Sequence, residues 1–106
     1  MIKLTPDIRE EVVHKMSIML EDRDQIVEDG WTVDECRNID LCARNDGDFA
    51  LLTDRERALC AQELKNTEDI ADDNKAYFHN KGERDAVRLS SRWIRALRSA
   101  ITELDA

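Results

Sequence analysis

The sequence predicts an all-α protein, a small four-helix bundle with three long helices and one short helix. Three observations lead to this class. The 106 residues include only three Gly and one Pro, which leaves few of the residues that the tight turns of a sheet require. Charged residues make up 38% of the chain, and many of them are the helix formers Glu and Arg. Apolar residues also recur at three- and four-residue steps. We expect one helical domain spanning residues 1–106.

The first predicted helix runs from Pro6 to about Asp29. Thr5 can cap it, Pro6 suits its first position, and Gly30 follows its end. An unbroken helix of this length is roughly 36 Å long. Its apolar stripe consists of Ile8, Val12, Met16, Met19, Leu20, Ile26 and Val27.

The second predicted helix is short. Thr32 and Glu35 have the spacing of a capping box, in which each side chain binds the other's free backbone N–H, and Gly47 follows its expected end. The next four residues, 49–52, are apolar. We interpret them as a plug for the end of the bundle, the alternative being an exposed patch that binds a partner.

The last two helices should form a C-terminal antiparallel helical hairpin, with its turn at Lys81 and Gly82. A second capping box, Thr53 with Glu56, opens the third helix, which we expect to continue to about Asn80 rather than break near residue 66. Its predicted inward residues are Leu59, Cys60, Leu64, Ile70, Ala71, Tyr77 and Phe78. Those of the last helix are Ala86, Val87, Ser90, Trp93, Ile94, Leu97, Ile101 and Leu104.

The segment Leu52-Thr53-Asp54-Arg55-Glu56 resembles the start of LuxR-type DNA-binding domains, in which a Leu-Thr-x-Arg-Glu motif opens a helix-turn-helix unit. The resemblance implies DNA contact by later helices, which Ile70 and Val87 would echo. These two residues are too far apart for that unit, and Asp72-Asp73 bring negative charge to its DNA-facing side. We therefore interpret the segment as a capping box.

The sequence favours no enzymatic chemistry. Neither of its two histidines, His14 and His79, has metal-ligand spacing to a Cys, Asp or Glu, and no phosphate-binding loop or nucleophile motif occurs. We therefore predict no catalytic residue, no metal site and no cofactor. The three cysteines include no CxxC pair, and no apolar run is long enough to span a membrane. These features predict a cytoplasmic protein without a membrane partner.

The strongest functional signal is a segregation of charge. The chain carries −8 overall, yet residues 84–98 carry +4. Five arginines at helical spacing form a stripe on the last helix: Arg84, Arg88, Arg92, Arg95 and Arg98. An acidic patch lies on the preceding helix: Glu68, Asp69, Asp72 and Asp73. Exposed ion pairs contribute only about 0–1 kcal/mol each, so stability alone explains the stripe poorly.

Three functions follow as hypotheses. The first is a non-enzymatic protein that binds another protein through these charged helix faces and modulates it, as regulatory proteins and phage anti-defence proteins do. We predict that this modulation is inhibition. The second is a nucleic-acid mimic whose acidic faces occupy a DNA or RNA channel of a target enzyme. The third is weak nucleic-acid binding through the Arg stripe, which the net negative charge disfavours. The unequal helix lengths leave part of the hairpin uncovered, which would suit a homodimer.

Overall fold

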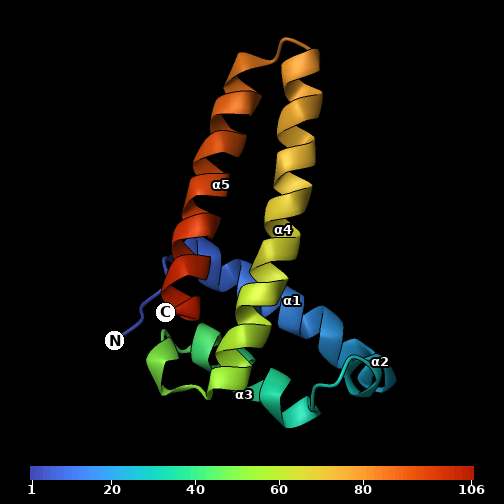
Figure 1. Cartoon of the computed structure of the whole chain (residues 1–106), viewed down its shortest axis with the longest axis vertical. Coiled ribbons are helices and arrows are strands. Elements are labelled where there is room, and N and C mark those ends of the chain that lie inside the picture. The colour runs from blue at the N-terminus through green and yellow to red at the C-terminus, as the bar shows by residue number, and fades with distance from the viewer.

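The computed structural model describes all 106 residues and confirms the all-α class, since it contains helices and no strand (Figure 1). The elements are α1 (Pro6–Glu21), α2 (Arg23–Glu28), α3 (Val33–Arg44), the 3₁₀ helix η1 (Phe49–Leu51), α4 (Asp54–Asn80) and α5 (Arg84–Asp105). The molecule measures 44 × 32 × 21 Å along its principal axes. None of its helices combines the length and the hydropathy that a membrane span requires.

Two helical pairs dominate the architecture. α1 packs mainly on α3, and α4 and α5 form the predicted C-terminal antiparallel hairpin. Figure 1 shows α1 crossing behind the lower half of this hairpin. A hydrogen bond fixes the crossing, because the Thr67 hydroxyl on α4 lies 3.0 Å from a carboxylate oxygen of Glu11 on α1. We call the lower half of the hairpin, together with the N-terminal segment, α1, α2, α3 and η1, the base.

The hydrophobic core lies entirely in the base. Its buried apolar residues are Leu4, Ile8, Val12, Met16, Ile26, Cys36, Ile39, Ala43, Phe49, Leu59, Cys60, Ala61, Leu64, Ala71, Ile94, Leu97, Ala100, Ile101 and Leu104. Burial raises the pKa of the Cys36 thiol to about 11 and that of Cys60 to about 12. Both residues therefore remain neutral thiols and act as small apolar core residues.

The predicted first helix differs from the structure, because it is broken at Asp22. The backbone there leaves the helical region (φ −127°, ψ 82°), and the Asp22 carboxylate accepts a hydrogen bond from the Gln25 N–H at 3.2 Å. Asp22 thus caps a new short helix, a role that suits its short acceptor side chain. The change of direction buries Ile26 but leaves Val27 68% exposed, so the prediction that Val27 faces inward was wrong.

Both predicted capping boxes are present, and the one at α4 also joins two helices. The Glu56 side chain accepts hydrogen bonds from the Thr53 N–H at 2.9 Å and from the Asn38 amide on α3 at 2.8 Å. These bonds satisfy a carboxylate that is almost completely buried. α4 then continues without interruption to Asn80, which confirms the prediction of one long helix. Because this segment is a single helix, it contains no helix-turn-helix unit.

Residues 49–52 plug the base, as predicted, through Phe49 and the partly buried Leu52. Phe49 is fully buried, whereas Leu51 is 84% exposed. The N-terminal segment is held against this plug, because the Phe49 N–H donates to the Ile2 carbonyl at 2.9 Å and the Ile2 N–H donates to the Asp48 carboxylate at 2.7 Å. The bond from the Ile2 N–H, together with one from the Ala50 N–H, lowers the pKa of Asp48.

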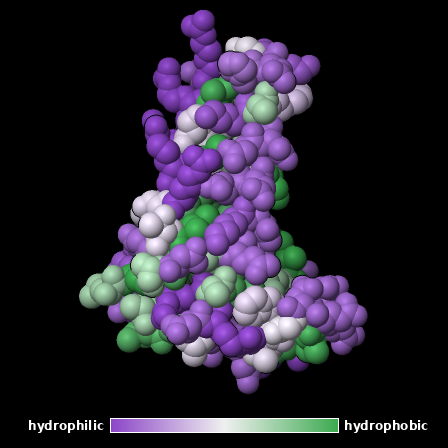
Figure 2. Space-filling view, in the orientation of Figure 1, coloured by the Kyte–Doolittle hydropathy of each residue, from purple (hydrophilic) through white to green (hydrophobic).

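Above the base the hairpin continues alone. Ala71 is the last buried residue of α4 and Ile94 is the first of α5, so no residue from 72 to 93 is buried. We call residues 72–93 the arm, and Figure 2 shows it as the narrow upper part of the molecule. The predictions that Ile70 and Tyr77 face inward were wrong, since these side chains are 56% and 58% exposed. They face outward because α1 and α3 end below them.

Candidate protein-binding surface

The Arg stripe lies along the exposed side of α5, and three of its five members, Arg84, Arg88 and Arg92, belong to the arm. The side chains of Arg84, Arg88, Arg92 and Arg95 are exposed and make no hydrogen bond or ion pair within the chain. At about 100° per residue, Arg84, Arg88 and Arg95 fall within about 40° of one another. Arg92 lies at the edge of the stripe, about 60° from Arg95.

Arg98, the fifth member, is different because it is paired. Its guanidinium lies 2.7 Å from a carboxylate oxygen of Glu68 and 3.8 Å from one of Asp72, both on α4. At its lower end the stripe is therefore in contact with the acidic patch. The stripe and the patch therefore lie on one face of the hairpin, which we call the charged face.

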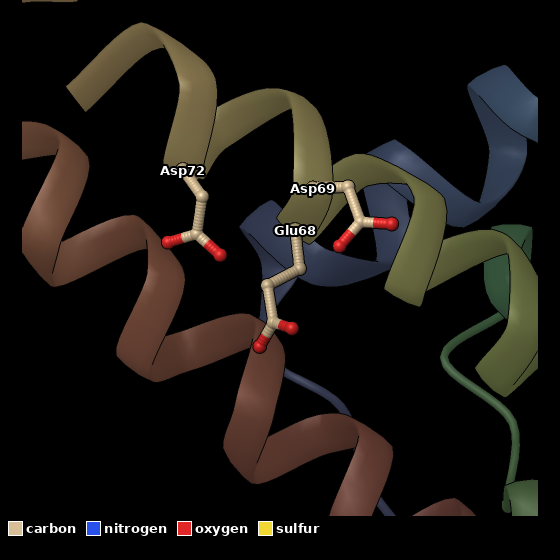
Figure 3. A group of neighbouring side chains, drawn as sticks. All are labelled: Glu68, Asp69 and Asp72. Atoms are coloured by element: carbon tan, nitrogen blue, oxygen red, sulfur yellow. The ribbon is translucent and has the colours of Figure 1, made fainter. Parts of the chain in front are cut away.

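Three of the four predicted acidic residues cluster on this face. The side chains of Glu68, Asp69 and Asp72 offer oxygens within 4.8 Å of one another, and Figure 3 shows Glu68 and Asp72 directed toward α5. Asp73 is not part of the cluster, because it lies about 100° farther round α4 than Asp72. Arg98 already provides positive charge to two of the three clustered carboxylates. The cluster is thus one half of an internal charge pair.

The remaining polar groups do not form a constellation of catalytic type. His14 and His79 are exposed and make no side-chain hydrogen bond. His14 borders a shallow surface hollow together with Trp93 of α5 and three acidic residues of α1, which are Asp7, Glu10 and Glu11. Cys36 and Cys60 are buried thiols, as described above. What the surface offers chemically is therefore a row of guanidiniums that can bind carboxylates.

Comparisons with known protein families, with curated proteins and with solved structures found no match.

Sequence reasoning predicted that part of the hairpin is uncovered, but it did not identify the exposed apolar face that lies there. Leu89 was absent from the predicted inward stripe of α5 and is 62% exposed, as Ile70 and Tyr77 are on α4. Helix length was the signal that pointed to it. α4 and α5 contain 27 and 22 residues, while α1 contains 16 and α3 contains 12, so the shorter helices can cover only part of the hairpin.

Proposed function

We propose that this protein is a non-enzymatic binding protein whose arm captures an acidic surface of another protein and modulates, by obstruction, what that surface does. One observation carries the proposal. Arg84, Arg88 and Arg95 project in the same direction from α5, and the first two lie in the arm, which adds no buried residue to the core. Of the large side chains of the arm, Trp93 packs against the core, so most of the arm's composition is free to serve binding.

The chemistry of the stripe suits carboxylates on a protein. Successive guanidiniums lie about one helical turn apart, which is about 5 Å along the axis. Each guanidinium can donate two parallel hydrogen bonds to one carboxylate, and desolvation at an interface strengthens such pairs. Because these arginines have no partner within the chain, binding does not first require an internal ion pair to break.

The chain as a whole disfavours nucleic acid as the ligand of this face. Its net charge is −8, so a polyanion is repelled by the rest of the molecule. Mimicry of nucleic acid by the acidic patch is supported less than capture by the stripe, because Arg98 neutralises part of that patch. Both alternatives remain outcomes of the experiment below.

The test is affinity capture from the lysate of the native host, comparing matched charge reversals. The first variant carries Arg84→Glu, Arg88→Glu and Arg95→Glu. The control carries Lys15→Glu, Arg23→Glu and Arg37→Glu, which change the net charge equally on residues of the base that make no ion pair. We expect the wild type and the control to retain one partner, and the stripe variant to lose it at least tenfold.

The result that contradicts the proposal is equal retention by the stripe variant. A third variant, with Glu68→Gln, Asp69→Asn, Asp72→Asn and Asp73→Asn, separates the alternatives. Selective loss of capture by this variant, with competition by an oligonucleotide, would support the mimic instead. A low-salt mobility-shift assay with the wild type should show no shifted nucleic acid, and a shift that disappears in the stripe variant would support direct nucleic-acid binding.

A further inference from the structure

The hairpin has an apolar face opposite its charged face, in the arm and directly below it. Its exposed members are Ile70 and Tyr77 on α4 and Leu89 on α5, and the half-buried Phe78 lies beside Tyr77 with ring centroids 5.6 Å apart. Seven residues separate Ile70 from Tyr77, which places both on one side of the helix. We call these four residues the apolar face. Large apolar side chains gathered on one side of a hairpin are typical of a surface that binds a partner.

α1 covers the continuation of this face in the base. Below the apolar face, α4 meets α1 through Thr67 and Glu11, and α5 meets it at Trp93, which borders Asp7 and Glu10. Ile70 lies three residues above Thr67 on α4, and Leu89 lies four residues above Trp93 on α5, so they continue the two surfaces that α1 covers. The hairpin therefore buries this side against a helix in the base and exposes it in the arm.

Tyr77 and Leu89 lie at the same height on the arm. The ion pair between Glu68 and Arg98 fixes one level of the antiparallel hairpin. Nine residues toward the tip from this level, α4 reaches Tyr77 and α5 reaches Leu89. The two residues thus define the middle of the exposed stretch between Trp93 and the turn.

The rims of the apolar face carry charges arranged symmetrically about this middle level. On α5, Asp85 and Arg92 are seven residues apart on one edge, and their midpoint is next to Leu89. On α4, Asp73 and Lys81 are eight residues apart, and their midpoint is Tyr77. The Lys81 ammonium lies 5.7 Å from the centre of the Tyr77 ring, which places it at the rim of the apolar face.

From this pattern we infer that the apolar face binds the apolar face of a second copy of this chain, with the two arms antiparallel. A two-fold axis at the level of Tyr77 and Leu89 brings Arg92 of each copy opposite Asp85 of the other. The same axis brings each Lys81 opposite the other Asp73. Both rims are therefore complementary in one arrangement, and the four arm helices bury their apolar sides as a four-helix bundle.

The antiparallel arrangement also fits the shape of the molecule. α1 protrudes on the same side as the apolar face, so two parallel arms would bring the two copies of α1 into collision. With antiparallel arms, the tip of each copy ends beside α1 of the other. There Lys81 meets the acidic edge of α1 around Glu10 and Glu11, in addition to Asp73.

Sedimentation equilibrium of the full chain, over a concentration series to about 200 µM, tests the inference. We expect a monomer–dimer equilibrium in the wild type. Leu89→Glu should remove the dimer, because it places two carboxylates at the centre of the interface. Arg92→Glu should raise the dissociation constant about tenfold, since it faces Asp85 of the other copy, and the double variant Asp85→Arg/Arg92→Glu should restore most of the affinity.

Arg95→Glu is the matched control, because it makes the same charge change on the same helix but on the charged face. It should leave the dissociation constant within about twofold. Circular dichroism verifies that each variant keeps its helicity. A wild type that stays monomeric, equal weakening by Arg92→Glu and Arg95→Glu, or no recovery in the double variant would each overturn the inference. The stripe variant described under Proposed function should still dimerise, so the two proposals fail separately.

Discussion

The base and the arm are built from the same two helices, yet they differ in what covers them. In the base, α4 and α5 pack against α1 and bury Leu64, Leu97 and Ile101. In the arm the same helices bury nothing completely, although their sequence is still amphipathic. The difference teaches that the apolar pattern of a helix sets which side faces inward, whereas the length of neighbouring helices sets how far that side is covered.

The largest expected difference between the two regions is the loss of unfolding free energy when a leucine is replaced by alanine. Leu64→Ala in the base should lower the free energy of unfolding by about 3 kcal/mol, because Leu64 is fully buried and its removal leaves a cavity. Leu89→Ala in the arm should cost less than about 0.5 kcal/mol, because the side chain is 62% exposed. Chemical denaturation at a dilution that favours the monomer measures both.

The two leucines are matched, since both substitutions are Leu→Ala inside a helix and change helix propensity equally. Similar losses for Leu64→Ala and Leu89→Ala would mean that the arm is packed as tightly as the base, which would contradict the comparison.

Hydrogen exchange should show a smaller but more detailed difference. In the dilute monomer, amides of residues 74–80 and 88–91 should exchange at least tenfold faster than those of 59–67 and 97–104, because the arm can open while the core stays intact. Mass spectrometry with peptide resolution measures the rates. Uniform exchange along α4 would show that the hairpin opens only as one unit. If raising the protein concentration slows amide exchange in the arm alone, the arm is the part of the chain that the dimer buries.

The smallest expected effects concern the helix starts, which also differ between the regions. Thr53 caps α4 in the base, whereas Glu83 precedes α5 at the tip of the arm and makes no side-chain cap. Thr53→Ala should lower the free energy of global unfolding by about 1 kcal/mol. Glu83→Ser should supply the missing cap and slow exchange in the arm, while leaving the global denaturation midpoint nearly unchanged. A shift of that midpoint by Glu83→Ser would mean that the arm and the base unfold together.

The sequence predicted the local features of this fold better than the contacts between helices. The capping boxes at Thr32 and Thr53 and the unbroken α4 follow from neighbouring residues, so they were visible in the chain. The break at Asp22 could not be predicted from neighbouring residues, because Asp occurs both as an exposed residue within a helix and as a helix cap. The packing of Ile26 decides between these two roles.

The candidate surface was predictable in part for the same reason. The stripe on α5 follows from the spacing of its arginines, but pairing depends on which residues of α4 lie across the hairpin. That register gives Arg98 the partners Glu68 and Asp72 and leaves Arg84 without one. The apolar face was hidden because Ile70 and Tyr77 continue a core pattern, and only the positions of α1 and α3 expose them.

The continuity of α4 has a mechanical consequence. Its 27 residues form one rod of about 40 Å with no hinge between the tip and the base. A sideways force on the tip therefore tilts the whole rod instead of folding the arm over. At the far end that tilt pulls on Glu56, whose carboxylate holds Asn38 of α3. A force applied to the tip is therefore transmitted to the contact between α4 and α3, which links the two helical pairs.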